Sequence, residues 1–227
     1  MKRTFFLTLI LIVIMAVASL SFAEFVEESF INTGIDHFDK KDYDKAIACF
    51  NRALELNNKN TTTYLIRGNS YFYKQDYQSA MKDYNKIIEL EPDNANAFYN
   101  RGICKLNLKQ YNASIADFNI VIEMEPDNAR PYCYRGLVQA SKGLYKEAID
   151  DYTRTIELNP DFIQAYGLRA EIYTRLGNNT AAQKDKIKAE ELKEKLANEE
   201  LENSKKKKPK VKQSYGRIAI MPYQRNF

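Results

Sequence analysis

Apolar residues recur at three- and four-residue steps through most of this chain, in short segments that turn residues separate. Met81, Tyr84 and Ile88 show the spacing, and each lies in a segment that also carries charged residues. A period near 3.6 residues is typical of a helix with one apolar face. The segments come in pairs from residue 27 to about residue 178, so the pattern predicts a series of antiparallel helices.

The paired segments repeat with a period of 34 residues. In residues 61–94 and 95–128 an aromatic residue, an Arg-Gly pair, a tyrosine and the sequence Glu-Pro-Asp-Asn recur at the same offsets. A fixed period of this length predicts a solenoid of stacked helix hairpins, because each hairpin buries its apolar face against the next. Extending the period in both directions gives five repeats, at residues 27–60, 61–94, 95–128, 129–162 and 163–196.

The repeat resembles the tetratricopeptide family at the positions by which that family packs one helix on another. When the glycine that recurs at Gly34, Gly68, Gly102 and Gly136 is the eighth position, positions 4 and 24 are aromatic in most repeats and position 20 is small. The resemblance covers about residues 27–196. It implies an all-α protein, a right-handed α-solenoid of about five hairpins. The polar end of the fifth repeat is expected to form a C-terminal capping helix.

Position 7 departs from the family pattern, since arginine replaces the usual buried leucine in repeats two to five. The antiparallel pairing of the two helices brings position 23 near position 7, and position 23 is aspartate in the same four repeats. The first repeat has Thr33 and Cys49 there and lacks both charges. We therefore expect structural ion pairs, partly shielded from water. They are Arg67–Asp83, Arg101–Asp117, Arg135–Asp151 and Arg169–Asp185.

The first 23 residues have the pattern of an export signal. Lys2 and Arg3 precede an apolar run, and Ser21-Phe22-Ala23 supplies small residues at a cleavage position. The alternative is an uncleaved anchor, because residues 4–23 are uncharged and about long enough to span a bilayer as a helix. Both interpretations place the solenoid outside the cytoplasm, in the periplasm or secreted.

The net charge of +4 is unevenly distributed. Residues 24–204 hold 24 basic and 30 acidic residues, whereas residues 205–227 hold eight basic residues and no acidic one. We expect the end of the cap and the tail, residues 197–227, to leave the solenoid, with a like-charge run that is disordered when free. This run either contacts an anionic surface, such as lipid headgroups, cell-wall polymer or nucleic acid, or stays solvated. It resembles a nuclear localisation run, but the leader argues against a nuclear address, and nucleic acid is the less expected partner. Its lysines are Lys205, Lys206, Lys207, Lys208, Lys210 and Lys212.

The last 14 residues, 214–227, contain a short apolar run at Ile218–Met221. Such a run is able to add as a strand to a partner or to fold back on the solenoid.

Residues for catalysis are scarce. His37 is the one histidine of the sequence, and Cys49, Cys104 and Cys133 lie in different repeats without metal-ligand spacing. No glycine-rich phosphate loop occurs. We therefore expect a non-enzymatic protein without metal or cofactor.

The resemblance implies a concave groove lined by the first helix of each repeat. Apolar and aromatic side chains with a few amides suit a bound peptide, although part of this stripe must pack between repeats. The family's carboxylate clamp for acidic C-terminal peptides is incomplete, because Leu65 and Tyr134 occupy two of its places while Asn69, Asn100 and Arg130 match the other three. The predicted groove residues are Ile35, Phe38, Leu65, Asn69, Phe72, Tyr73, Tyr99, Asn100, Ile103, Arg130, Tyr134 and Leu137.

These features together predict an exported scaffold that binds a protein or peptide segment in its groove. The chain resembles bacterial envelope repeat proteins that assist the assembly or secretion of larger complexes. The alternative is an adaptor tethered to a membrane, with the leader and the basic tail contacting anionic surfaces.

Overall fold

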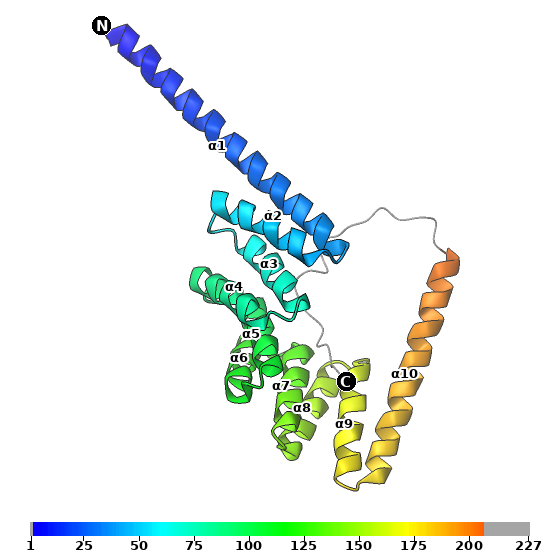
Figure 1. The fold of residues 1–227 in the computed structure, drawn as a ribbon. Coiled ribbons are helices and arrows are strands. Elements are labelled where there is room, and N and C mark those ends of the chain that lie inside the picture. The colour runs from blue at the N-terminus through cyan, green and yellow to red at the C-terminus, as the bar shows by residue number, and fades with distance from the viewer. Residues whose placement is uncertain (1, 207–227) are drawn as a thin grey trace. The chain divides into compact units, whose positions relative to one another are not determined.

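The computed structural model describes the backbone of residues 2–206 and most of the side chains between residues 22 and 202. The described residues form helices joined by short turns, without a strand. The helices fall into two compact parts, Met1–Pro92 and Asp93–Phe227. Within each part, successive helices pair as antiparallel hairpins (Figure 1). This is the all-α solenoid of helix hairpins that the 34-residue period predicts.

The N-terminal part contains the first two hairpins. Consecutive helices pack on each other, and the first helices of the two repeats also touch, as expected for stacked hairpins. Its helices are α1 (Lys2–Asp39), α2 (Tyr43–Leu56), α3 (Thr61–Tyr73) and α4 (Tyr77–Leu90).

The C-terminal part contains three hairpins built in the same way. The first helices of its repeats form a row, because α7 contacts both α5 and α9. The helices are α5 (Ala95–Asn107), α6 (Tyr111–Met124), α7 (Ala129–Ser141), α8 (Tyr145–Leu158), α9 (Ile163–Arg175) and α10 (Asn179–Lys206).

Local sequence sets the helix ends. The side chains of Asn60, Asn94 and Asn128 accept hydrogen bonds from the first backbone N–H groups of α3, α5 and α7, which stabilises those N-termini. The turn inside each hairpin has one residue in the left-handed region, which is glycine in the last two repeats, Gly143 and Gly177. Short turns of fixed conformation hold the two helices of a repeat in one register.

The recurring glycine at position 8 allows a large ring at position 24 to lie against the first helix. A Cβ atom added to Gly136 would lie 2.9 Å from Cε1 of Tyr152, which is fully buried. Gly167, at another position of its repeat, has no such neighbour within 4 Å. The position-8 glycines therefore serve helix packing.

Two predicted boundaries fall inside observed helices. Helix α1 is continuous through residues 23 and 24, the predicted cleavage position, and the side chains of nearly all of the leader's apolar run lie outside the described residues. Helix α10 continues past residue 196 to Lys206, so Lys205 and Lys206 are helical rather than part of a disordered tail. Lys207, Lys208, Lys210, Lys212 and residues 214–227 lie outside the described residues.

Among the residues that the structure describes, no helix combines the length and apolar character needed to cross a membrane.

Candidate functional site

The arginine at position 7 and the aspartate at position 23 meet in each of repeats two to five. In the fourth repeat Nε of Arg135 donates to Oδ2 of Asp151 at 2.8 Å, and Nη2 donates to Oδ1 at 2.7 Å. Asp151 is buried and Arg135 is partly buried. The other three predicted pairs have the same two-bond geometry. Two parallel charge-assisted bonds fix the angle of the guanidinium as well as its position.

Three of these arginines also contact the second helix of the preceding repeat. Nη1 of Arg135 donates to Oδ1 of Asn119 at 2.7 Å, and Nη1 of Arg169 donates to Oγ1 of Thr153 at 2.8 Å. The contact of Arg67 with Asn51 is equivalent. Each such arginine therefore joins three helices, which is a structural role.

Each guanidinium in this row also lies over the aromatic ring at position 4 of its own helix. The distance from Cζ of Arg135 to the centre of the Tyr132 ring is 5.6 Å. The ring and the hydrogen-bond partners together leave these arginines engaged within the fold, so they are not ligand contacts.

Eight of the twelve predicted groove residues are buried, so the prediction that they line a ligand groove is wrong. Their side chains are at most 5% exposed. The first helices of neighbouring repeats pack closely enough that these residues fill the space between helices. The eight are Ile35, Asn69, Phe72, Tyr99, Asn100, Ile103, Tyr134 and Leu137.

In the C-terminal part, Tyr99 and Tyr134 show why the predicted groove is filled by side chains. Their ring centres are 5.4 Å apart in an edge-on arrangement, and both rings lie within 6.1 Å of the Phe118 ring from α6. Burial, with the neighbouring Tyr134 adding to it, raises the pKa of Tyr99 well above its ordinary value. These rings are core, not a binding surface.

The amide of Asn69 is used inside the fold as well. The hydroxyl of Tyr84 on α4 donates to its Oδ1 at 2.9 Å, and both residues are fully buried. Asn100 is also buried, which leaves Arg130 as the exposed member of the three residues that match the family's clamp. The described residues therefore do not form a carboxylate clamp.

Four predicted groove residues keep exposed surface, and two of them belong to one aromatic cluster. Leu65 is partly buried and Arg130 is exposed, and these two lie apart on α3 and α7. Phe38 at the end of α1 and Tyr73 at the end of α3 are partly buried, and Tyr43 at the start of α2 lies against both. We call Phe38, Tyr43 and Tyr73 the aromatic platform.

The three rings of the platform contact one another directly. Tyr43 and Tyr73 are stacked, with ring centres 5.5 Å apart and an angle of 10° between the planes. Phe38 meets both of them edge-on, at 5.6 Å and 5.7 Å. Beneath them Phe72, 2% exposed, packs against Tyr73 and Tyr77. The platform is therefore a continuous aromatic surface built from three helices.

The chemistry of the platform is neutral and amphipathic. Burial raises the pKa of Tyr43 and of Tyr73, so both phenols stay protonated at neutral pH. Two ion pairs lie beside the rings, Lys74 with Asp44 and Lys45 with Asp42. Asp39, Lys40 and Lys41, between Phe38 and Tyr43, are exposed. Ring faces with protonated hydroxyl groups can bury apolar side chains of a ligand and still bond to its backbone.

Sequence reasoning missed Tyr43, although a sequence signal existed. Position 13 is Tyr73 in the second repeat but Asn107, Ser141 and Arg175 in the next three. Position 12 is likewise aromatic only in the first two repeats, as Phe38 and Phe72, whereas position 17 is tyrosine in the first four. Tyr43 therefore has aromatic neighbours in Phe38 of its own repeat and Tyr73 of the next, a combination that the later tyrosines at position 17 lack.

The histidine and the cysteines lie apart from one another. Nδ1 of His37 is 3.8 Å from Oδ2 of Asp42, and the three cysteines are free thiols on α2, α5 and α7. Burial raises the pKa of the Cys133 thiol to about 12, so this thiol stays protonated at neutral pH. Within the described residues no group of three potential metal ligands converges.

The family model of the ETO1 C-terminal domain matches residues 19–210. Among solved structures, MamA is 30% identical, with a TM-score of 0.66 over 73% of this chain and 96% of its own. MamA of Desulfovibrio magneticus RS-1 is 19% identical, with a TM-score of 0.69 over 75% of this chain and 96% of its own. YrrB, described as a TPR protein with an unusual peptide-binding site, is 23% identical, with a TM-score of 0.58 over 72% and 84%. No curated protein matches the chain.

Proposed function

The chain belongs to the family of the ETO1 C-terminal domain and is a tetratricopeptide-repeat protein, and from that premise we propose that it holds a segment of a partner protein on the aromatic platform. A role as a protein-interaction scaffold follows from the family and the fold. The proposal adds the contact surface and the kind of ligand, an extended peptide with apolar side chains.

The partial exposure of the platform is the observation that carries this proposal. The other large rings predicted for the groove, Phe72, Tyr99 and Tyr134, are buried and have no surface to offer. Phe38, Tyr43 and Tyr73 keep exposed surface while their neighbours hold them in place. A ring that is already ordered loses little side-chain entropy on binding, so most of its buried area contributes to affinity.

The charges around the platform favour an uncharged segment. The charged residues at positions 39–45 and 74–76, next to the rings in the sequence, are four basic and four acidic side chains. A ligand therefore meets little net charge, and ring burial has to supply the binding energy. A peptide-binding site is also what YrrB is described as having, and YrrB shares the fold. The proposal therefore names an apolar or proline-containing extended peptide, which aromatic surfaces bind well.

We place this activity outside the cytoplasm, in envelope assembly or secretion, and take the protein to be non-enzymatic. The charge and apolar pattern of residues 1–23 supports export. The alternative, a membrane-tethered adaptor, rests on the same leader and on the six tail lysines. Binding to anionic vesicles that survives replacement of those lysines by glutamine would count against the adaptor.

Removing the two stacked rings tests the platform. We expect the double variant Tyr43→Ala/Tyr73→Ala to bind the protein that co-purifies with the full chain about thirtyfold more weakly, because buried aromatic contacts of this kind are worth about 2 kcal/mol or more. Recovery of the partner is measured by affinity capture and quantitative mass spectrometry, alongside a circular dichroism melt that checks folding.

Tyr145→Ala is the matched control. Tyr145 starts α8 at the same repeat position as Tyr43 and is also partly buried, but it lies outside the platform. This variant is expected to keep the partner. Equal recovery with the double variant, with its fold intact, would rule out the platform as the contact.

A further inference from the structure

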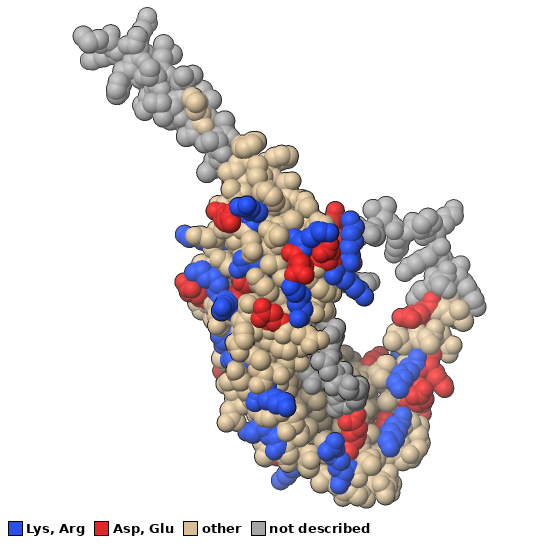
Figure 2. Space-filling view, viewed as in Figure 1, with Lys and Arg blue, Asp and Glu red and all other residues tan. Residues whose placement is uncertain are grey.

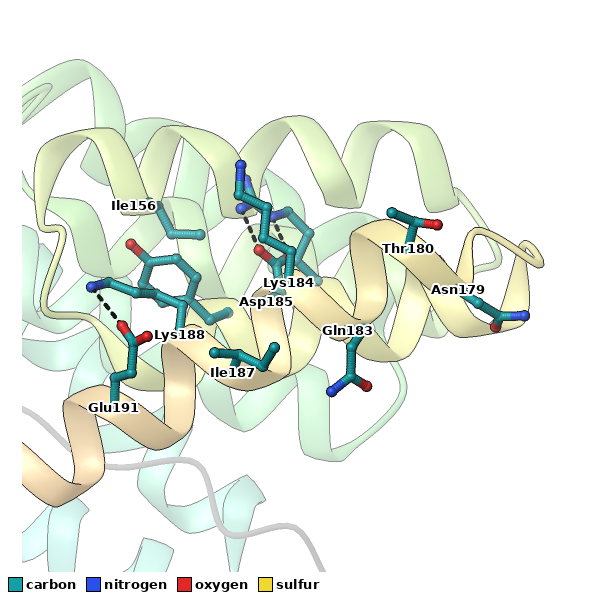
Figure 3. A pocket seen from close by; sticks show the side chains of 11 residues that line it. Ile156, Asn179, Thr180, Gln183, Lys184, Asp185, Ile187, Lys188 and Glu191 are labelled. Atoms are coloured by element: carbon teal, nitrogen blue, oxygen red, sulfur yellow. Dashed lines mark hydrogen bonds and ion pairs between the residues drawn. The ribbon is translucent and has the colours of Figure 1, made fainter.

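The C-terminal part has a second surface feature, a groove of about 980 Å³ between α8 and α10 (Figure 3). Ile156 from α8, Tyr166 from α9 and Ile187 from α10 supply its apolar lining. Lys184, Lys188 and Glu191 lie along its α10 side, as do the amides of Asn179 and Gln183. We call this the terminal groove.

The exposed isoleucine in the terminal groove breaks the pattern of the other repeats. Ile187 is at position 25, where Asn51, Asn119 and Thr153 each accept a hydrogen bond from the next arginine. In the fifth repeat no arginine-bearing repeat follows, and Ile187 is 51% exposed. At position 25 of the fifth repeat, the apolar Ile187 thus stands where other repeats have a hydrogen-bond acceptor. An exposed apolar side chain in a groove is typical of a surface that another segment covers.

We propose that the terminal groove binds the C-terminal segment of the same chain, residues 214–227, through its uncharged residues from Ile218 to Tyr223. This segment lies outside the described residues. Three observations on the described helices and on the sequence favour it as the occupant: the reach of the chain, the charge along α10 and the composition of the segment.

The chain is long enough to return to the groove. Ile187 is 19 residues before Lys206, the end of α10, which is about 28 Å along the helix at 1.5 Å per residue. The 12 residues 207–218 span up to about 40 Å when extended. A chain that leaves α10 and runs back beside it therefore brings Ile218 to the groove with length to spare.

The charges along that path are complementary. Residues 190–202 of α10 hold six glutamates and two lysines, and Figure 2 shows acidic side chains gathered along that end of the helix. Residues 207–212, which would run back beside them, hold four lysines and no acidic residue. Opposite charges along two antiparallel segments attract at the separation of a packed chain.

The composition of the tail changes at residue 218, the point at which the returning chain would reach the terminal groove. Residues 218–223 are Ile-Ala-Ile-Met-Pro-Tyr and carry no charge. Bringing them beside Lys184 and Lys188 involves no like-charge repulsion, and their apolar side chains would cover Ile156 and Ile187. In this arrangement the lysine run is held along α10, so an anionic surface has to compete with α10 for it.

Photo-cross-linking in the full chain tests this docking. With p-benzoylphenylalanine in place of Ile187, irradiation is expected to attach residues 218–225, which trypsin releases as one peptide between Arg217 and Arg225. The matched control places the same group at Leu176, which is 55% exposed in the turn before α10. Cross-linked peptides are identified by mass spectrometry, and a mixture of light and heavy isotope-labelled protein distinguishes the same chain from a second copy.

The proposal predicts a cross-link from position 187 within one chain, a yield that falls to the control level in Ile220→Asp, and a yield that decreases at high salt. A cross-link found only between light and heavy chains would overturn it, because the occupant would then be a second copy. Absence of residues 218–225 from the products of position 187, equal yield from position 176, or a yield unchanged by Ile220→Asp would overturn it as well.

Discussion

Replacing Asp151 with alanine is expected to lower the free energy of unfolding by about 3–5 kcal/mol. Its carboxylate accepts both hydrogen bonds of the Arg135 fork, and the side chains are 8% and 22% exposed. Without Asp151 the guanidinium keeps Asn119 as a partner but loses its counter-charge in a site that water barely reaches. The cost is the burial of an uncompensated charge, and it is larger than the value of the pair itself.

The double variant Arg135→Leu/Asp151→Ala separates these two quantities. It removes both charges and puts at position 7 the leucine that related repeats use, so we expect a stability within about 1 kcal/mol of the parent. Asp150→Ala, an exposed neighbour on α8, should change stability by less than about 0.5 kcal/mol. Urea unfolding followed by circular dichroism measures all three. A double variant as unstable as Asp151→Ala would contradict the account.

Tyr134→Ala is expected to cost about 3–5 kcal/mol, because it empties a ring-sized space between helices. The ring is 5% exposed and touches the rings of Tyr99 and Phe118. Tyr134→Phe keeps the ring and should cost much less, which the same urea titration measures. If Tyr134→Ala unfolded at the parental urea concentration, the ring would belong to a surface rather than to the core.

This prediction affects how binding experiments are interpreted. A variant at Tyr99 or Tyr134 that loses a partner would do so through unfolding. Substitutions at the platform remove partly exposed rings and leave the buried Phe72 beneath them in place.

The sequence was sufficient for the hairpins and for the four Arg–Asp pairs. Both partners of a pair belong to one repeat, 16 residues apart, and a short turn fixes how its two helices align. The third contact, from Arg135 to Asn119, crosses between repeats and depends on how neighbouring hairpins are spaced. That spacing is a result of packing and is not encoded at any single position.

For the same reason, the sequence alone could not predict which of the groove positions are exposed. Positions 5 and 6 face the inner side of a tetratricopeptide repeat, but rings as large as Tyr99 and Tyr134 fill the gap to the next helix and bury each other. Tyr43 stacks on Tyr73 at the turn end of the hairpins, where both rings stay partly exposed. Side-chain volume and the position of the turn decide these outcomes together.

The most direct test of the platform is hydroxyl-radical footprinting of the full chain with and without its co-purified partner. The rates of oxidation at Tyr43, Tyr73 and Tyr145 are measured by mass spectrometry in each state. We predict that the rates at Tyr43 and Tyr73 fall in the complex while the rate at Tyr145 is unchanged. Equal rates at Tyr43 and Tyr73 in the free and bound protein would contradict the proposal that the partner lies on these rings.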